Sequence, residues 1–165
     1  MCSSDLAADG RRAVPLGLSR ILAGETAFGA DGFRYCGSIL GSAGDPQFAA
    51  DDRLLERATL LAEIVTRAFG LVGVNGVDFV ARRGFPYAIE VNPRYTAAME
   101  LVERAYGISL FDVHARACRQ ALPAFDVAAA RRRAPEAIGK AIVYARRTSV
   151  LGDTRSWLSD RKSVV

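Results

Sequence analysis

Apolar residues recur at helical spacing over residues 53–69. They repeat at about the 3.6-residue period that brings side chains onto one face of a helix. Asp51 or Asp52 can cap the start of this helix, and Gly70 can end it. The apolar positions are Leu54, Ala58, Leu61, Ala62, Val65 and Phe69.

Short β-rich segments predict strands on both sides of this helix. Residues 11–22 and 33–41 precede it and are separated by a glycine-rich stretch. Residues 71–80 and 86–93 follow it, with the segment 82–85 between them as a turn. We therefore expect the second pair of strands to form an antiparallel hairpin.

The last third of the chain alternates between helical and extended patterns. Two helices are expected over 96–106 and 109–121, and Pro123 stops the second. A linker rich in Arg and Ala is expected over 127–136, followed by a last strand over 137–145. Together these elements predict the α+β class, with an antiparallel sheet packed by helices.

The composition is that of one folded domain. The chain has 165 residues, of which 50% are hydrophobic and 24% charged, which excludes a disordered or low-complexity protein. No segment approaches the roughly 20 apolar residues of a membrane span, and the first residues do not read as a signal peptide. We therefore expect a cytoplasmic protein with no membrane partner. The three cysteines lie far apart without a CxxC pair, so they are expected to be reduced thiols.

The formal net charge of +4 raises the question of a nucleic-acid partner. The arginines are scattered, their only run is 131–133, and no aromatic platform accompanies them. This pattern argues against nucleic-acid binding. Only Lys140 and Lys162 are lysines, so none precedes residue 140.

The two ends of the chain do not read as part of the domain. Residues 2–6 (CSSDL) have the sequence that one reading frame of a common sequencing adapter encodes, and residues 160–165 (DRKSVV) have that of the opposite orientation. We therefore expect 1–6 and 160–165 to be adapter-derived. The domain is then expected over 7–159, as a piece of a longer protein.

The polar residues of the hairpin sort onto one face. A turn centred on Gly84 places Asp78 directly opposite Glu90. Side chains alternate between the two faces of a strand, so residues two apart share a face. The polar face carries the pairs Asp78–Glu90, Gly76–Asn92 and Val74–Arg94, and the apolar face carries Val77–Val91 and Phe79–Ile89.

The opposed acids predict a cation between them. Carboxylates on paired residues, with Cβ atoms about 4.5–5.5 Å apart, repel each other unless a cation intervenes. Magnesium is suited to this place, because it prefers carboxylate and phosphate oxygens. Asn92 and Arg94 lie about 6.6 Å apart along the same face, so they can reach successive positions of a polyphosphate. The alternative is a surface hairpin with a solvated polar face; the agreement of register, face and the string EVNPR favours the Mg-nucleotide site.

The stretch GLVGVNGVDFVARRGFPYAIEVNPRYTAAMELVERAYG resembles the C-terminal half of the ATP-grasp domain, a nucleotide-binding module of ligases. The closest likeness is to uncharacterised ATP-grasp proteins of carbon–nitrogen ligase type. The resemblance implies the C-terminal subdomain of an ATP-grasp fold. It also implies that Asp78 and Glu90 coordinate magnesium, that Asn92 coordinates a second metal ion, and that Arg94 stabilises the phosphoryl group in transfer.

The resemblance further implies an ATP-dependent ligase that uses ATP with Mg²⁺ or Mn²⁺. A small-molecule carboxylate attacks the γ-phosphate, and an amine or another nucleophile opens the resulting acyl phosphate. Family members clamp the ATP phosphates with lysines encoded upstream, and this chain has no lysine there. The 165 residues alone are therefore expected to bind ATP poorly and to catalyse nothing. The alternatives are a non-catalytic nucleotide- or metal-binding domain and a carbamoyl-phosphate-synthetase-like half domain.

Three further polar residues have open roles. Glu100 either faces the substrate or is explained by the favourable interaction of an acidic side chain in the first turn with the dipole of its helix. His114, the only histidine, fits a packed or half-exposed core position better than a catalytic base. Lys140 opens the last strand and has no partner that the sequence identifies. The substrates and the oligomeric state are left open as well.

Overall fold

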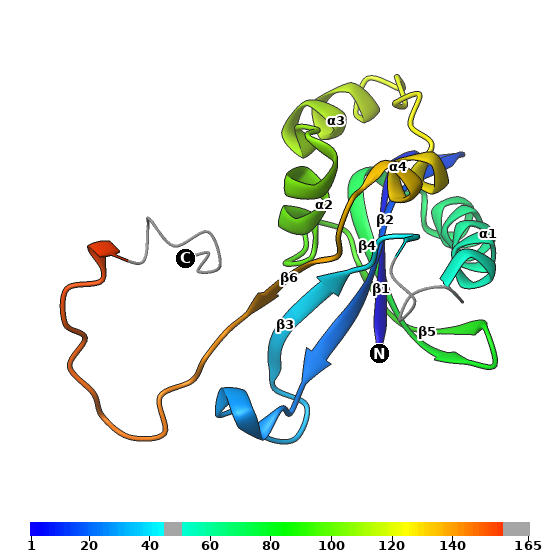
Figure 1. The fold of residues 1–165 in the computed structure, drawn as a ribbon. Helices are drawn as coiled ribbons and strands as arrows, with labels where there is room; N and C mark the ends of the chain where they lie inside the picture. The colour runs from blue at the N-terminus through cyan, green and yellow to red at the C-terminus, as the bar shows by residue number, and fades with distance from the viewer. Residues whose placement is uncertain (45–50, 157–165) are drawn as a thin grey trace.

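A six-stranded antiparallel sheet forms the centre of the molecule (Figure 1). The computed structural model describes residues 1–44 and 51–156. The strand order is β5-β4-β1-β2-β3-β6, so the expected hairpin lies at one edge. The strands are β1 (Cys2–Asp9), β2 (Ala13–Ala23), β3 (Tyr35–Leu40), β4 (Val72–Arg82), β5 (Phe85–Asn92) and β6 (Ile138–Ala141).

Helices cover both faces of this sheet (Figure 1). On one face Ala62 of α1 packs with Leu6 of β1, and on the other Val102 of α2 packs in one cluster with Ala7. The arrangement confirms the expected α+β class with an antiparallel sheet packed by helices. The helices are η1 (Thr26–Phe28), α1 (Asp51–Phe69), α2 (Met99–Tyr106), α3 (Leu110–Ala117) and α4 (Val127–Arg133).

The first residues form part of the sheet, although the sequence led us to place the domain boundary after residue 6; their adapter origin stays a prediction. β1 pairs with β2 on one side and with β4 on the other, from Cys2 onward. Ser3, Ser4 and Asp5 are at most 2% exposed, although their side chains are polar. Sequence patterning missed this strand because its first half has no apolar alternation. The other end, 160–165, lies outside the described residues.

The expected linker over 127–136 is also wrong, because α4 occupies most of it. The Asp126 side chain accepts a hydrogen bond from the Ala129 N–H at 2.9 Å and so caps the helix. Arg131 of this helix is 1% exposed and forms an ion pair with Asp52 of α1. The last strand is shorter than the expected 137–145 and ends at Ala141.

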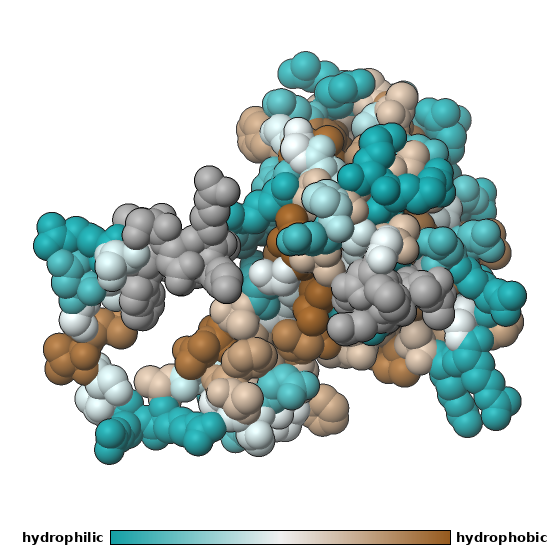
Figure 2. All heavy atoms as spheres, viewed as in Figure 1, coloured by the Kyte–Doolittle hydropathy of each residue, from teal (hydrophilic) through white to brown (hydrophobic). Residues whose placement is uncertain are grey.

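None of the helices in the described parts of the chain combines the length and apolar character needed to cross a bilayer. Figure 2 shows polar residues over much of the helical part, while hydrophobic residues gather around β6 and the chain that follows it.

Candidate metal and nucleotide site

The hairpin of β4 and β5 brings the two predicted acids face to face. Asp78 pairs with Glu90, and the flanking pairs Val77–Val91 and Gly76–Asn92 have the predicted register. A tight turn connects the strands through two residues with positive φ, Arg83 (50°) and Gly84 (73°). This conformation matches a type I′ turn, which suits the twist of paired strands.

Two details of the predicted register are wrong, and they offset each other at the acids. The turn is centred between Arg83 and Gly84 rather than on Gly84, so Phe79 pairs with Ala88 and not with Ile89. A β-bulge between Asp78 and Phe79 then restores the predicted pairing at Glu90. Because of the bulge, Ile89 is 59% exposed instead of buried.

The predicted pair of Val74 with Arg94 does not form. β5 ends at Asn92, and Arg94 lies beyond it in the segment that leads to α2. Val74 instead packs in the core beneath α2 and α3. Arg94 still reaches the polar face, because its guanidinium donates to the Asn92 Oδ1 at 2.9 Å.

All four predicted site residues line one cleft of about 200 Å³. The acids and Asn92 come from the hairpin, Arg94 and Thr96 come from the segment before α2, and the far end reaches β3. The remaining lining residues are Ser3, Ile21, Tyr35, Ser38, Ala97 and Ala98. The cleft therefore joins segments that are widely separated in the sequence.

A chain of hydrogen bonds orders the end of this cleft that carries the two acids. Arg94 donates to Asn92, and the Asn92 Nδ2 donates to the Asp78 Oδ2 at 3.2 Å. Asn92 is only 6% exposed, whereas Glu90 is open to solvent. In this arrangement the Asn92 Oδ1 faces Arg94, so the amide must rotate before that oxygen can meet a cation between the acids.

The donor set fits a hard divalent cation that takes part of its shell from a ligand. Neither Asp78 nor Glu90 has a salt-bridge partner among the described residues, so the opposed charges are uncompensated by protein cations. No group of three or more His, Cys, Asp or Glu side chains gathers in the described parts of the chain. Magnesium needs no such group, since one or two carboxylates with phosphates and water complete its octahedron.

A buried carboxyl group lies behind the cleft and was missed from the sequence. Asp5 of β1 pairs with Gly76, and the Thr96 hydroxyl donates to its Oδ1 at 2.8 Å. Burial away from water raises the pKa of Asp5 to about 7, against a lowering effect of the Thr96 hydrogen bond. A Cβ at Gly76 would lie 2.4 Å from the Thr96 Cγ2, so only glycine leaves room for this contact.

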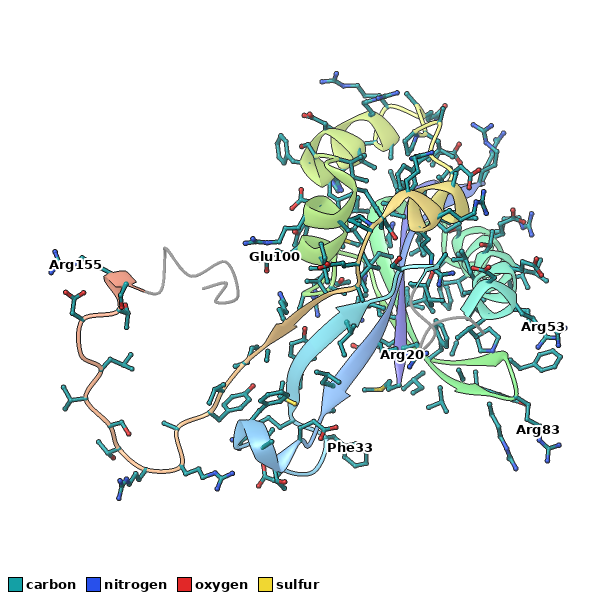
Figure 3. The ribbon with its side chains drawn as sticks, in the orientation of Figure 1. Arg20, Phe33, Arg53, Arg83, Glu100 and Arg155 are labelled. Carbon is teal, nitrogen blue, oxygen red and sulfur yellow. The ribbon has the colours of Figure 1, made fainter. Side chains whose placement is uncertain are left out.

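Lys140, which had no partner in the sequence, binds Glu100. Its Nζ lies 3.0 Å from the Glu100 Oε2, and Arg104 lies 2.9 Å from the Oε1 of the same carboxylate. The Lys140 hydrogen bond, assisted by Arg104, holds the pKa of the Glu100 carboxyl below its usual value. Figure 3 labels Glu100 on α2, beside the path of β6.

His114 has a structural contact rather than a place in the cleft. Its Nδ1 accepts a hydrogen bond from the Val74 N–H at 3.1 Å. Gly73 in β4 has a φ of +80°, and a Cβ there would lie 2.4 Å from this nitrogen. The histidine therefore satisfies a backbone donor where the strand is distorted.

Comparison with known families identifies the domain. Residues 1–98 match the sequence model of a family described as an ATP-grasp domain. The chain belongs to the ATP-grasp family. The matched region of this ATP-grasp domain contains all four predicted site residues, whereas Glu100 and Lys140 lie beyond it. No curated protein matches the chain.

Solved structures share the fold of this ATP-grasp domain. The biotin carboxylase domain of a single-chain bacterial carboxylase is 17% identical, with a TM-score of 0.57, over 85% of this chain and 31% of its own. Urea carboxylase from Kluyveromyces lactis is 18% identical, with a TM-score of 0.56, over 76% of this chain and 10% of its own. An ATP-grasp superfamily protein from Archaeoglobus fulgidus is 29% identical over 69% of this chain and 33% of its own, with a TM-score of 0.49. The chain thus spans about a third or less of each of these proteins.

Proposed function

We propose that this domain binds Mg-ATP, or Mn-ATP, in the cleft and is part of an ATP-dependent ligase. The observation that carries the proposal is the direct pairing of Asp78 with Glu90, to which no cation in the described part of the chain is ion-paired. These two carboxylates would hold the metal ion, and Asn92 would add an amide oxygen after rotating. The bound ion supplies positive charge to the phosphate oxygens.

The neighbouring row of the sheet suits the base of a nucleotide. Val80 lies two residues after Asp78 on the same face and pairs with Tyr87 of β5. Val80 is 46% exposed and Tyr87 is 59% exposed, so the pair forms an apolar shelf beside the acids. An apolar shelf next to a metal site favours a ligand with a flat base and a polyphosphate over a bare ion.

Arg94 is placed to act on the phosphoryl group in transfer. A guanidinium carries a permanent charge and donates to phosphate oxygens in bidentate geometry. In the proposed reaction a substrate carboxylate oxygen forms a bond to the γ-phosphorus while the bond to the ADP oxygen breaks. An amine then attacks the acyl phosphate, and inorganic phosphate leaves. Such transfer depends mainly on positioning and charge neutralisation, which this set of residues can provide.

A non-catalytic nucleotide-binding domain is the second candidate. The observation in its favour is that no lysine precedes residue 140, so the described cleft has no lysine clamp from that part of the chain. A domain with a metal site and no phosphate clamp can bind nucleotide for regulation or assembly. Metal-dependent turnover of ATP separates the two candidates.

The test is ATP turnover by the complete protein to which this domain belongs. Asp78→Ala and Glu90→Ala are each expected to abolish metal-dependent turnover, because each removes a ligand of the ion. Arg94→Ala is expected to lower kcat by about a hundredfold with a smaller effect on nucleotide affinity. Asp112→Ala on α3 is the matched control and should retain turnover. Unchanged turnover in both acid variants contradicts the site, and complete absence of turnover in the unmodified protein favours the non-catalytic candidate.

A further inference from the structure

The cleft continues past the acids toward the opposite edge of the sheet. Its far end is lined by Tyr35 and Ser38 of β3, whose hydroxyl groups are hydrogen-bonded at 2.9 Å. Ser38 pairs directly with Lys140 of β6, so both side chains lie on the face of the sheet that forms the cleft. A cation therefore stands next to the far end of the cleft.

Lys140 is set into the molecule rather than extended into solvent. Its side chain is 21% exposed and is held by Glu100 from α2. Glu100 also binds Arg104, so one carboxylate serves two cations and the local charge is positive. The lowered pKa of Glu100 makes it a weak base, which argues against a proton-transfer role for this group.

The distance from the two acids determines what Lys140 can recognise. Four strand spacings separate β4 from β6, which amounts to about 19 Å across the sheet. A lysine side chain reaching back along the cleft still leaves more than about 10 Å to the acids. On this estimate Lys140 lies beyond the reach of a phosphoryl group held at the acids, next to the opposite end of the cleft.

We propose that Lys140, held by Glu100 and flanked by the Ser38 hydroxyl, binds an anionic group at the distal end of the ligase substrate. The substrate would then carry a carboxylate or phosphate remote from the atom that reacts. The proposal rests on the proposed function for the identity of the ligand as a substrate. The anion site itself is independent of the metal and can be tested without it.

The chain allows Lys140 to be observed directly, because it contains only one other lysine. In a Lys162→Arg variant, ¹³C-dimethylation labels Lys140 as the sole lysine side chain. Titration with inorganic phosphate, and separately with glutarate, should move the Lys140 NMR signal saturably. The anion that binds more tightly indicates whether the substrate group is a phosphate or a carboxylate. Sodium chloride at equal ionic strength should move the signal far less. A shift no larger than that with sodium chloride overturns the proposal.

Two further variants separate this site from its surroundings. Arg104→Gln removes the second cation that binds Glu100. The anion affinity measured from the Lys140 signal should stay within about twofold of the parent value, because an exposed ion pair contributes little. Ser38→Ala should weaken anion binding by about fivefold, because a hydroxyl donor is lost. If Arg104→Gln is the only variant that loses the shift, the anion binds at Arg104 on the solvent side, which contradicts the proposal. Asp78→Asn should retain the shift. A failure of the proposed metal site can therefore be distinguished from a failure of the proposed anion site.

Discussion

At the residue scale, the site depends on carboxyl groups that have no ion-pair partner within residues 1–44 and 51–156. Asp78 and Glu90 oppose each other at the cleft, and Asp5 is buried behind it, where its Oδ1 accepts a hydrogen bond from the Thr96 hydroxyl. The Oδ2 of Asp5 has no hydrogen-bond partner among the described residues. Carboxylates in such places cost stability when ionised. Asp5, whose pKa is raised by burial, therefore couples the stability of the domain to pH.

Asp5 is expected to make the domain less stable as the pH rises. Its pKa is about 7 in the folded chain and near its ordinary value of 3.8 when unfolded. The folded state thus binds the proton more tightly, so stability is greatest below about pH 4 for this group and falls as the pH rises through 7. The loss is at most on the order of 4 kcal/mol for a shift of this size. Urea denaturation of the wild type and of Asp5→Asn at a series of pH values measures it.

The difference between Asp5→Asn and the wild type should grow in favour of the variant between pH 4 and pH 8. Asp9→Asn is the matched control on the same strand. Arg12 and two backbone N–H groups hold the pKa of Asp9 below its usual value, so its contribution has the opposite sign. A pH-independent difference for Asp5→Asn would contradict the assignment of a raised pKa.

At the element scale, the β4–β5 hairpin and the segment before α2 build the site together. Asp78, Glu90 and Asn92 come from the hairpin, and Arg94 and Thr96 come from the segment that crosses back over the sheet. The close approach of that segment to β4 requires a strand position without a side chain. Gly76 provides this position.

Gly76→Ala is expected to destabilise the domain by about 1–3 kcal/mol, because the new Cβ overlaps the Thr96 side chain. Displacing Thr96 also breaks its hydrogen bond to Asp5. Gly139→Ala on β6 is the matched control, since its nearest neighbours lie 3.6 Å from the added Cβ. Thermal or urea unfolding monitored by circular dichroism compares the two. Equal effects of both substitutions would show that the contact with Thr96 is not tight.

The acid pair could be predicted from the sequence because side chains alternate between the two faces of a strand. Other elements of the fold give no comparable local pattern. The alternation of β4 and β5 determines faces, so Asp78 and Glu90 were correctly opposed even though the turn centre was misplaced and the bulge was missed. β1 was missed because its polar Ser3, Ser4 and Asp5 are buried, contrary to the usual pattern. The Glu100–Lys140 pair joins residues 40 apart, and no local pattern reports such a contact.

At the scale of the whole molecule, the cleft runs across an ATP-grasp sheet from the two acids toward β3, the strand that pairs with Lys140 of β6. The acids lie on the edge hairpin, and Lys140 lies on the strand at the opposite edge. A formal net charge of +4 favours the approach of anionic ligands to the molecule as a whole. A polyphosphate anchored through a cation at one end and a substrate anchored at the other would meet between them.

Manganese binding to this chain tests the central claim most directly. Mn²⁺ reports on a magnesium site, and its free EPR signal falls in proportion to the bound fraction. Asp78→Asn and Glu90→Gln are each expected to weaken Mn²⁺ binding by about tenfold or more, because each neutral amide replaces a charged ligand. Asp112→Asn should bind as the wild type does. Mn²⁺ affinity that is the same in both acid variants and in the wild type would contradict the account.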